Sequence, residues 1–99
     1  MPDSEIMTHI PITVGAASTA VLPANGNRKY LLLENISGEN IDFKFGEAAV
    51  LNEGIRLYAY GGKYELSRKR AGETGYMNPG AINAICVSGG MTLLVTEGT

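Results

Sequence analysis

The stretch formed by residues 28–45 constrains the fold more than any other part of the chain. It reads RKYLLLENISGENIDFKF, with two short apolar runs on either side of a polar connection that contains glycine. Short apolar runs bounded by turn residues are typical of β-strands. In the second run three large apolar side chains alternate with Asp42 and Lys44, which predicts one buried face and one face that shows both charges to water. We therefore expect a β-hairpin at the centre of a small all-β domain.

The rest of the chain repeats this pattern of short apolar runs and glycine-rich turns. Strands are predicted at residues 10–14, 18–22, 29–34, 41–45, 55–60, 63–67, 81–87 and 91–96. The last two are predicted to form a second hairpin around Ser88-Gly89-Gly90, and Pro11 places the first at a sheet edge or strand start. Residues 46–54 are predicted to be a loop. About eight short strands indicate a small antiparallel β-sandwich of jelly-roll or Greek-key type.

Length and composition agree with one small domain. Of the 99 residues, residues 1–9 are predicted to be a flexible N-terminal arm because their start is polar, acidic and without periodicity, and residues 10–99 to be a single β-sandwich domain. A formal net charge of −2 argues against a grip on bare nucleic acid. No run reaches the roughly 18 apolar residues that span a bilayer, and the N-terminus does not read as a secretory signal. We expect a protein made in the cytosol.

Residue chemistry alone predicts no catalytic residue, cofactor or metal site. His9 is the only histidine, and a solvated surface side chain is the favoured interpretation. The single cysteine, Cys86, stands between Ile85 and Val87, which favours a buried structural thiol over a nucleophile. For the carboxylates Asp42 and Glu47, a solvated charge pattern is favoured over acid–base chemistry.

The most informative candidate surface contains tyrosines. With two-residue spacing, Arg56, Tyr58 and Tyr60 share one predicted strand face, and Tyr64 follows the next turn. Tyrosine and arginine are enriched at protein interfaces because they offer large amphipathic area at low entropic cost. A protein-contact surface and ordinary packing of tyrosines at a sheet edge both remain open.

One run of basic residues, Arg68-Lys69-Arg70, lies in the longest polar stretch. A solvated loop is the favoured interpretation, an acidic protein partner the second and nucleic acid the third, because aromatic residues for base stacking are missing from the run. We keep all three residues as possible protein contacts.

The chain as a whole carries a pattern of strand and turn residues. The positions are Thr13-Val14, Thr19 to Leu22, Asn25, Arg28, Leu31 to Leu33, Asn35, Phe45-Gly46, Gly54-Ile55, Leu57, Gly62, Tyr64-Glu65, Gly80 to Ile85 and Leu94 to Glu97. This pattern resembles the small all-β virion proteins of tailed bacteriophages that sit on capsids as decoration or cement proteins. The resemblance covers roughly residues 10–97.

The resemblance implies a non-enzymatic structural role on the outer capsid surface of a virion. The implied partners are the major capsid protein or another virion protein, with no nucleic acid and no membrane. It also implies a symmetric homo-oligomer, for which a trimer is favoured. The alternative is a fibre, baseplate or host-attachment module that binds carbohydrate or another virion protein, for which the tyrosines could stack on sugar rings.

Overall fold

The computed structural model describes residues 6–67 and 77–99, and these form an all-β structure without a helix. Its strands are β1 (Met7–Val14), β2 (Thr19–Leu22), β3 (Tyr30–Asn35), β4 (Ile41–Phe45), β5 (Ile55–Leu57), β6 (Gly62–Ser67), β7 (Ile82–Ile85) and β8 (Met91–Gly98). All pairings are antiparallel. The prediction of a small antiparallel sandwich with about eight strands is confirmed.

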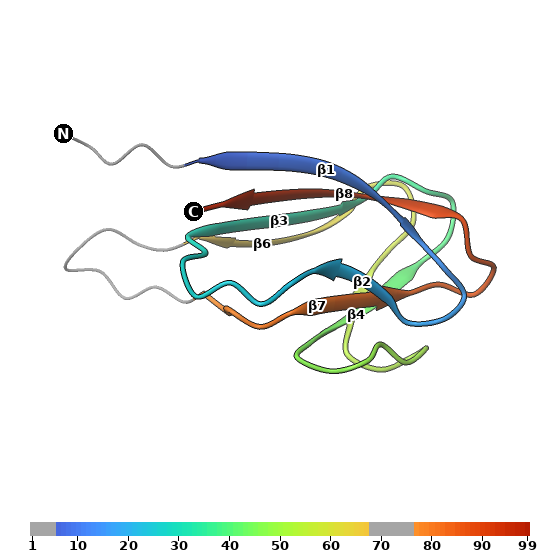
Figure 1. Ribbon diagram of the computed structural model, residues 1–99. Coiled ribbons are helices and arrows are strands. Elements are labelled where there is room, and N and C mark those ends of the chain that lie inside the picture. Colours follow the sequence, from blue (N-terminus) through green and yellow to red (C-terminus); the bar gives the residue numbers. More distant parts are fainter. Residues whose placement is uncertain (1–5, 68–76) are drawn as a thin grey trace, which may run out of the picture.

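The strands form two four-stranded sheets that face each other. The order is β1-β8-β3-β6 in the first, here called sheet A, and β2-β7-β4-β5 in the second, sheet B. In Figure 1 the strands of sheet A lie in one layer above β2, β7 and β4. The pairs β1·β8, β2·β7, β3·β6 and β4·β5 are nested, as if one long hairpin with its tip between β4 and β5 were wrapped around itself.

Both predicted hairpins are wrong. The expected partners β3 and β4 lie in different sheets, and so do β7 and β8. The connection from β3 to β4 is held by the buried side chain of Asn35, whose amide donates to the carbonyls of Glu39 (2.6 Å) and Leu57 (3.0 Å). Its oxygen accepts from the backbone N–H of Ser37 (2.9 Å), so the amide stabilises a turn that leads out of sheet A towards sheet B.

Two strand boundaries differ from the prediction by three residues, and the others by two or fewer. β1 begins at Met7, so that Met7 to His9 of the predicted arm are paired with β8, while residues 1–5 lie outside the described part. β5 ends at Leu57 instead of Tyr60, because the chain turns sharply there. Tyr60 has a positive φ of 61°, and the N–H of Gly62 donates to the carbonyl of Tyr58 (3.0 Å). A Cβ on Gly62 would collide with the backbone of Tyr58, so this turn requires glycine.

The core fills the space between the sheets with aliphatic and aromatic side chains. Ile41 and Phe43 are fully buried, as the alternation predicted, and the ring of Phe43 packs edge-on against Phe45 and Tyr64 with centroids 5.7 and 5.2 Å away. Edge-to-face pairs of this kind add to the stabilisation from area burial. Cys86 is buried in the same core, as predicted, with its Sγ 3.3 Å from the carbonyl of Val14.

Candidate contact surface

An ion pair on the outer face of sheet B joins β4 to β5. The register places Asp42 opposite Arg56, and the Arg56 Nε and Nη2 donate to the two Asp42 carboxylate oxygens at 2.8 and 3.1 Å. The same Nη2 donates to the side-chain oxygen of Asn52 at 2.6 Å. A two-pronged arginine–carboxylate pair is among the strongest hydrogen-bonded arrangements in proteins. The three side chains therefore form one rigid polar unit.

The loop between β4 and β5 folds back over this face. The backbone N–H of Asn52 donates to Asp42 (2.8 Å), and the Lys44 ammonium pairs with Glu53 (2.8 Å). Farther along the loop, the Asn83 amide donates to the carbonyl of Glu47 (2.8 Å). The prediction of a loop at residues 46–54 is confirmed. The expectation that Asp42 faces water is wrong, because this loop and Arg56 leave Asp42 only 3% exposed.

The partners of Asp42 change its acidity. Hydrogen bonds from Arg56 hold the pKa of the Asp42 carboxyl below its ordinary value, against the opposing effect of burial, and the bond from the Asn52 N–H adds to the lowering. The same pair raises the pKa of the Arg56 guanidinium. Because both groups are stabilised in their charged forms, the pair is suited to holding β4 and β5 together and not to transferring a proton.

A polar depression of about 240 Å³ opens beside this pair. It is lined by Asp42, Asn52, Glu53, Gly54, Arg56 and Tyr58. Tyr58 is 66% exposed at its rim, and Arg56 keeps 36% of its side-chain surface exposed. The structure thus brings together two of the predicted contact residues, Arg56 and Tyr58, through a turn and not through a shared strand face.

The other predicted contact residues are dispersed. Tyr60 is 85% exposed but does not line the depression, and its hydroxyl lies near Gly38 in the turn between β3 and β4. Tyr64 packs against the core between Phe43 and Phe45, so the interpretation as packing holds for this tyrosine. The run Arg68-Lys69-Arg70 lies outside the described residues.

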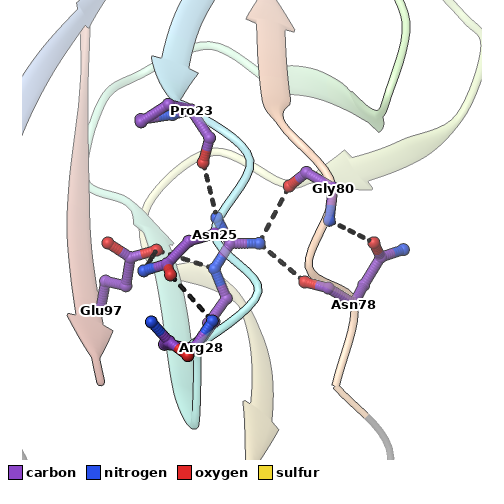
Figure 2. Close-up of polar contacts among 7 residues, drawn as sticks. Pro23, Asn25, Arg28, Asn78, Gly80 and Glu97 are labelled. Atoms are coloured by element: carbon purple, nitrogen blue, oxygen red, sulfur yellow. Dashed lines mark hydrogen bonds and ion pairs between the residues drawn. The ribbon is translucent and has the colours of Figure 1, made fainter.

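A buried polar cluster lies at the end of the sandwich opposite to the Asp42–Arg56 pair. Residue chemistry alone did not predict it as a site. Figure 2 shows the Arg28 guanidinium between Glu97 of β8 on one side and the segment from Asn78 to Gly80 on the other. Arg28 donates to Glu97 (2.8 Å), to the carbonyls of Asn78 (2.7 Å) and Gly80 (2.9 Å), and to the carbonyl of Pro23 (3.1 Å). Its side chain has no exposed surface. The cluster therefore connects three chain segments and has no room for a ligand at the guanidinium.

A second depression lies on sheet A, between β1 and β8. It measures about 200 Å³ and is lined by His9, Ile10, Pro11, Leu94, Val95 and Thr96. The His9 Nδ1 is 3.0 Å from the Thr96 hydroxyl, so the ring is held against the neighbouring strand. The lining is mostly apolar. This surface offers mainly apolar contact area, and His9 is the one titratable side chain in its lining.

Comparison of the chain with protein-family models, with curated proteins and with solved structures finds no match. Within residues 6–67 and 77–99, no three His, Cys, Asp or Glu side chains come close enough together to hold a metal ion. The same residues contain no helix that is long and apolar enough to cross a membrane.

Proposed function

We propose that the chain is a non-enzymatic structural protein of a tailed-phage virion that binds and stabilises the outer capsid surface. The observation that supports this most directly is the strand order. Eight strands in two sheets, paired as nested β1·β8, β2·β7, β3·β6 and β4·β5, suggest a jelly roll, a fold type that viral capsid proteins use. A fold by itself does not fix a function, so the proposal also depends on the resemblance of the strand and turn residues to phage decoration proteins.

The contact surface that we propose for the capsid is the rim of the polar depression, with Arg56 and Tyr58 as its main residues. The ion pair with Asp42 orients Arg56 before binding, and a side chain held in place loses little entropy when a partner docks. Tyr58 adds exposed aromatic area beside it. The expected trimer stays a prediction, and the mass of the purified protein in solution tests it.

The first test is whether the chain is part of a particle. Virions of the phage that encodes it are purified on a density gradient, digested and analysed by mass spectrometry. We expect the chain in many copies per particle, and we expect particles from a strain that lacks the gene to release their DNA at a lower temperature. Absence of the chain from purified virions rules the proposal out.

The second test addresses the contact surface with matched tyrosine variants. Tyr58→Ala should weaken binding to capsids that lack the chain by tenfold or more, in the range found for interface hot spots. Tyr60→Ala removes a tyrosine that is also highly exposed but lies outside the depression, and it should bind like the unaltered protein. Equal binding by both variants would place the contact elsewhere.

The alternative is an attachment module that binds carbohydrate, and one observation favours it. Tyr58 stands at the rim of a depression whose other side chains include Asp42, Asn52 and Glu53, so an aromatic face lies beside carboxylate and amide groups. Lectins share the fold type proposed above. A glycan array separates the two functions, because a cement protein should retain no sugar, whereas an attachment module should retain one class and lose it with Tyr58→Ala.

A further inference from the structure

The two sheets have four edge strands, and three of them are protected against pairing with another chain. β5 has three residues and carries Arg56. β2 has four residues and an irregular register, and β6 carries Lys63 and Glu65. Short length, bulges and charges are the usual means by which proteins block sheet edges. β1 differs from all three, since its eight residues, MTHIPITV, include no acidic residue, lysine or arginine.

Hydrogen bonds at one end of β1 establish which of its backbone groups face outward. Ile6 and Thr99 exchange two backbone hydrogen bonds, of 3.1 and 3.0 Å. In an antiparallel ladder the bonded pairs alternate, so every second residue from Ile6 onwards bonds to β8. The N–H and C=O groups of Met7 and His9 therefore point away from β8. Among the described residues no strand pairs with this side of β1.

Pro11 belongs to the same outward-facing set. Proline has no N–H, so it fits an edge strand only where that group would face solvent. At this position it leaves the ladder with β8 intact and breaks a ladder on the outer side. The open part of the edge therefore extends from Ile6 to Ile10. These residues are all exposed, and Ile6 is 70% exposed.

We propose that this edge pairs antiparallel with the same edge of a second copy of the chain, about a two-fold axis at Thr8. In that register Met7 of each copy exchanges two hydrogen bonds with His9 of the other. No bond of this pairing requires an N–H at residue 11, where Pro11 has none. The arrangement joins the two A sheets into one continuous sheet. The inference does not depend on the proposed virion function, and it differs from the trimer that the resemblance favours, so the mass in solution decides between the two.

The side chains fit the same register. Ile6, Thr8 and Ile10 share one face of the strand, because successive side chains alternate. Pairing about Thr8 places Ile6 of one copy opposite Ile10 of the other, so that two exposed apolar side chains cover each other on both sides of the axis. With no carboxylate, lysine or arginine from Met7 to Val14, and with His9 opposite Met7, no like charges lie directly opposite each other across the axis. The side chains of this edge therefore favour pairing with a second copy.

The contact is small, and its affinity should be correspondingly modest. One strand pair with flanking side chains lies at the lower end of interface sizes. We expect a dissociation constant in the range of about 1–100 μM. Sedimentation equilibrium from about 1 μM to 1 mM chain covers that range. The expected result is a reversible monomer–dimer equilibrium, and a chain that stays monomeric throughout, or that forms a trimer instead, overturns the proposal.

Two variants of His9 test the register. His9→Pro removes one outward-facing N–H and no bond to β8, and it should abolish the dimer. His9→Ala removes the same side chain and its contact with Thr96 but keeps the N–H, and it should retain the dimer. The melting temperatures of both variants show whether they are folded. If His9→Pro does not fold, Ile6→Lys places a charge at an exposed position and should weaken the dimer at least tenfold. Dimerisation that survives these changes overturns the proposal.

A cross-link tests the two-fold axis directly. Thr8 faces Thr8 of the second copy as a non-hydrogen-bonded pair, for which the Cα atoms are about 4.5 Å apart, within the range of a disulfide. Thr8→Cys should form a covalent dimer under mild oxidation. The unaltered protein is the control, because its single cysteine, Cys86, is buried. A dimer in solution without this cross-link means that another surface is used.

Discussion

Arg28 should contribute more to the stability of the fold than any other charged side chain that the structure describes. Its side chain is fully buried and donates four hydrogen bonds, one to the Glu97 carboxylate and three to the carbonyls of Pro23, Asn78 and Gly80. Arg28→Met keeps most of the volume and removes all four donors. The substitution leaves Glu97 without its charged partner and three carbonyls without donors.

The magnitude follows from these contacts. Removing one partner of a buried ion pair costs about 3–5 kcal/mol. The lower end applies here, because the Glu97 side chain is 15% exposed and keeps a bond from the Asn25 amide at 3.3 Å. We expect a loss of about 3 kcal/mol, a large share of the roughly 5–15 kcal/mol that stabilises a small domain. At a slope near 1–1.5 kcal/mol per molar urea, the unfolding midpoint should fall by about 2–3 M.

Urea unfolding followed by circular dichroism measures this loss, with Arg56→Met as the matched control. Arg56 is also an arginine paired with a carboxylate, but its side chain is 36% exposed and itself covers Asp42. Arg56→Met therefore lets water reach the Asp42 carboxylate, which also keeps the bond from the Asn52 N–H, so the loss should be smaller. Arg28→Lys should fall between the unaltered protein and Arg28→Met, since an ammonium keeps the charge but cannot reach acceptors on three sides. A loss below about 1 kcal/mol for Arg28→Met, or one equal to that of Arg56→Met, would refute the argument.

Two further predictions concern the loop over sheet B. Because Arg56 lowers the pKa of Asp42, the stabilisation from this carboxylate is complete above its unfolded pKa of about 3.9 and is lost as pH falls through the lower folded value. Urea midpoints measured between about pH 2 and 5 should therefore fall less steeply in Asp42→Asn than in the unaltered protein, and parallel curves would contradict the assignment. Gly54 has φ +87° and a Cβ there would lie 2.5 Å from the carbonyl oxygen of Phe43, whereas Gly46 has φ +81° and open space around it. Gly54→Ala should lower the thermal midpoint well beyond Gly46→Ala, and equal shifts would show that the collision is relieved.

The positions of most strands could be predicted because they depend on local patterns. Alternation at residues 41–45 marks β4 within its observed bounds, and the buried Ile41 and Phe43 follow from the same pattern. The pairing of strands could not be predicted in this way. A glycine-containing turn after β3 is compatible with a return along the same sheet or a crossing to the other one. The Asn35 side chain favours the crossing, because its amide donates to the backbone carbonyls of Glu39 and Leu57. Leu57 lies 22 residues farther along the chain.

The candidate contact surface, too, could be predicted from the sequence only in part. Exposed Tyr58 and Arg56 were predictable from residue type, but their grouping with Asp42 and Asn52 depends on a turn that ends β5 three residues early. Opposite charges at outward positions of neighbouring strands, Asp42 and Arg56, were a usable signal for that ion pair. The Arg28 cluster had no comparable signal, because its partner Glu97 is 69 residues away along the chain.

Pro11 connects the sequence to the proposed dimer most closely. A proline inside a strand predicts an edge, and β1 is an edge strand. Sequence alone does not tell which residues beside the proline face outward, because that parity depends on the register with β8. The bonds between Ile6 and Thr99 establish the parity and place Met7 and His9 on the open side. Pro11 is compatible with the edge position of β1. Because it lacks an N–H, it also ends hydrogen bonding on the outer side after Met7 and His9. A second copy can therefore pair through Met7 and His9, while a long fibre-like ladder along the whole strand is blocked.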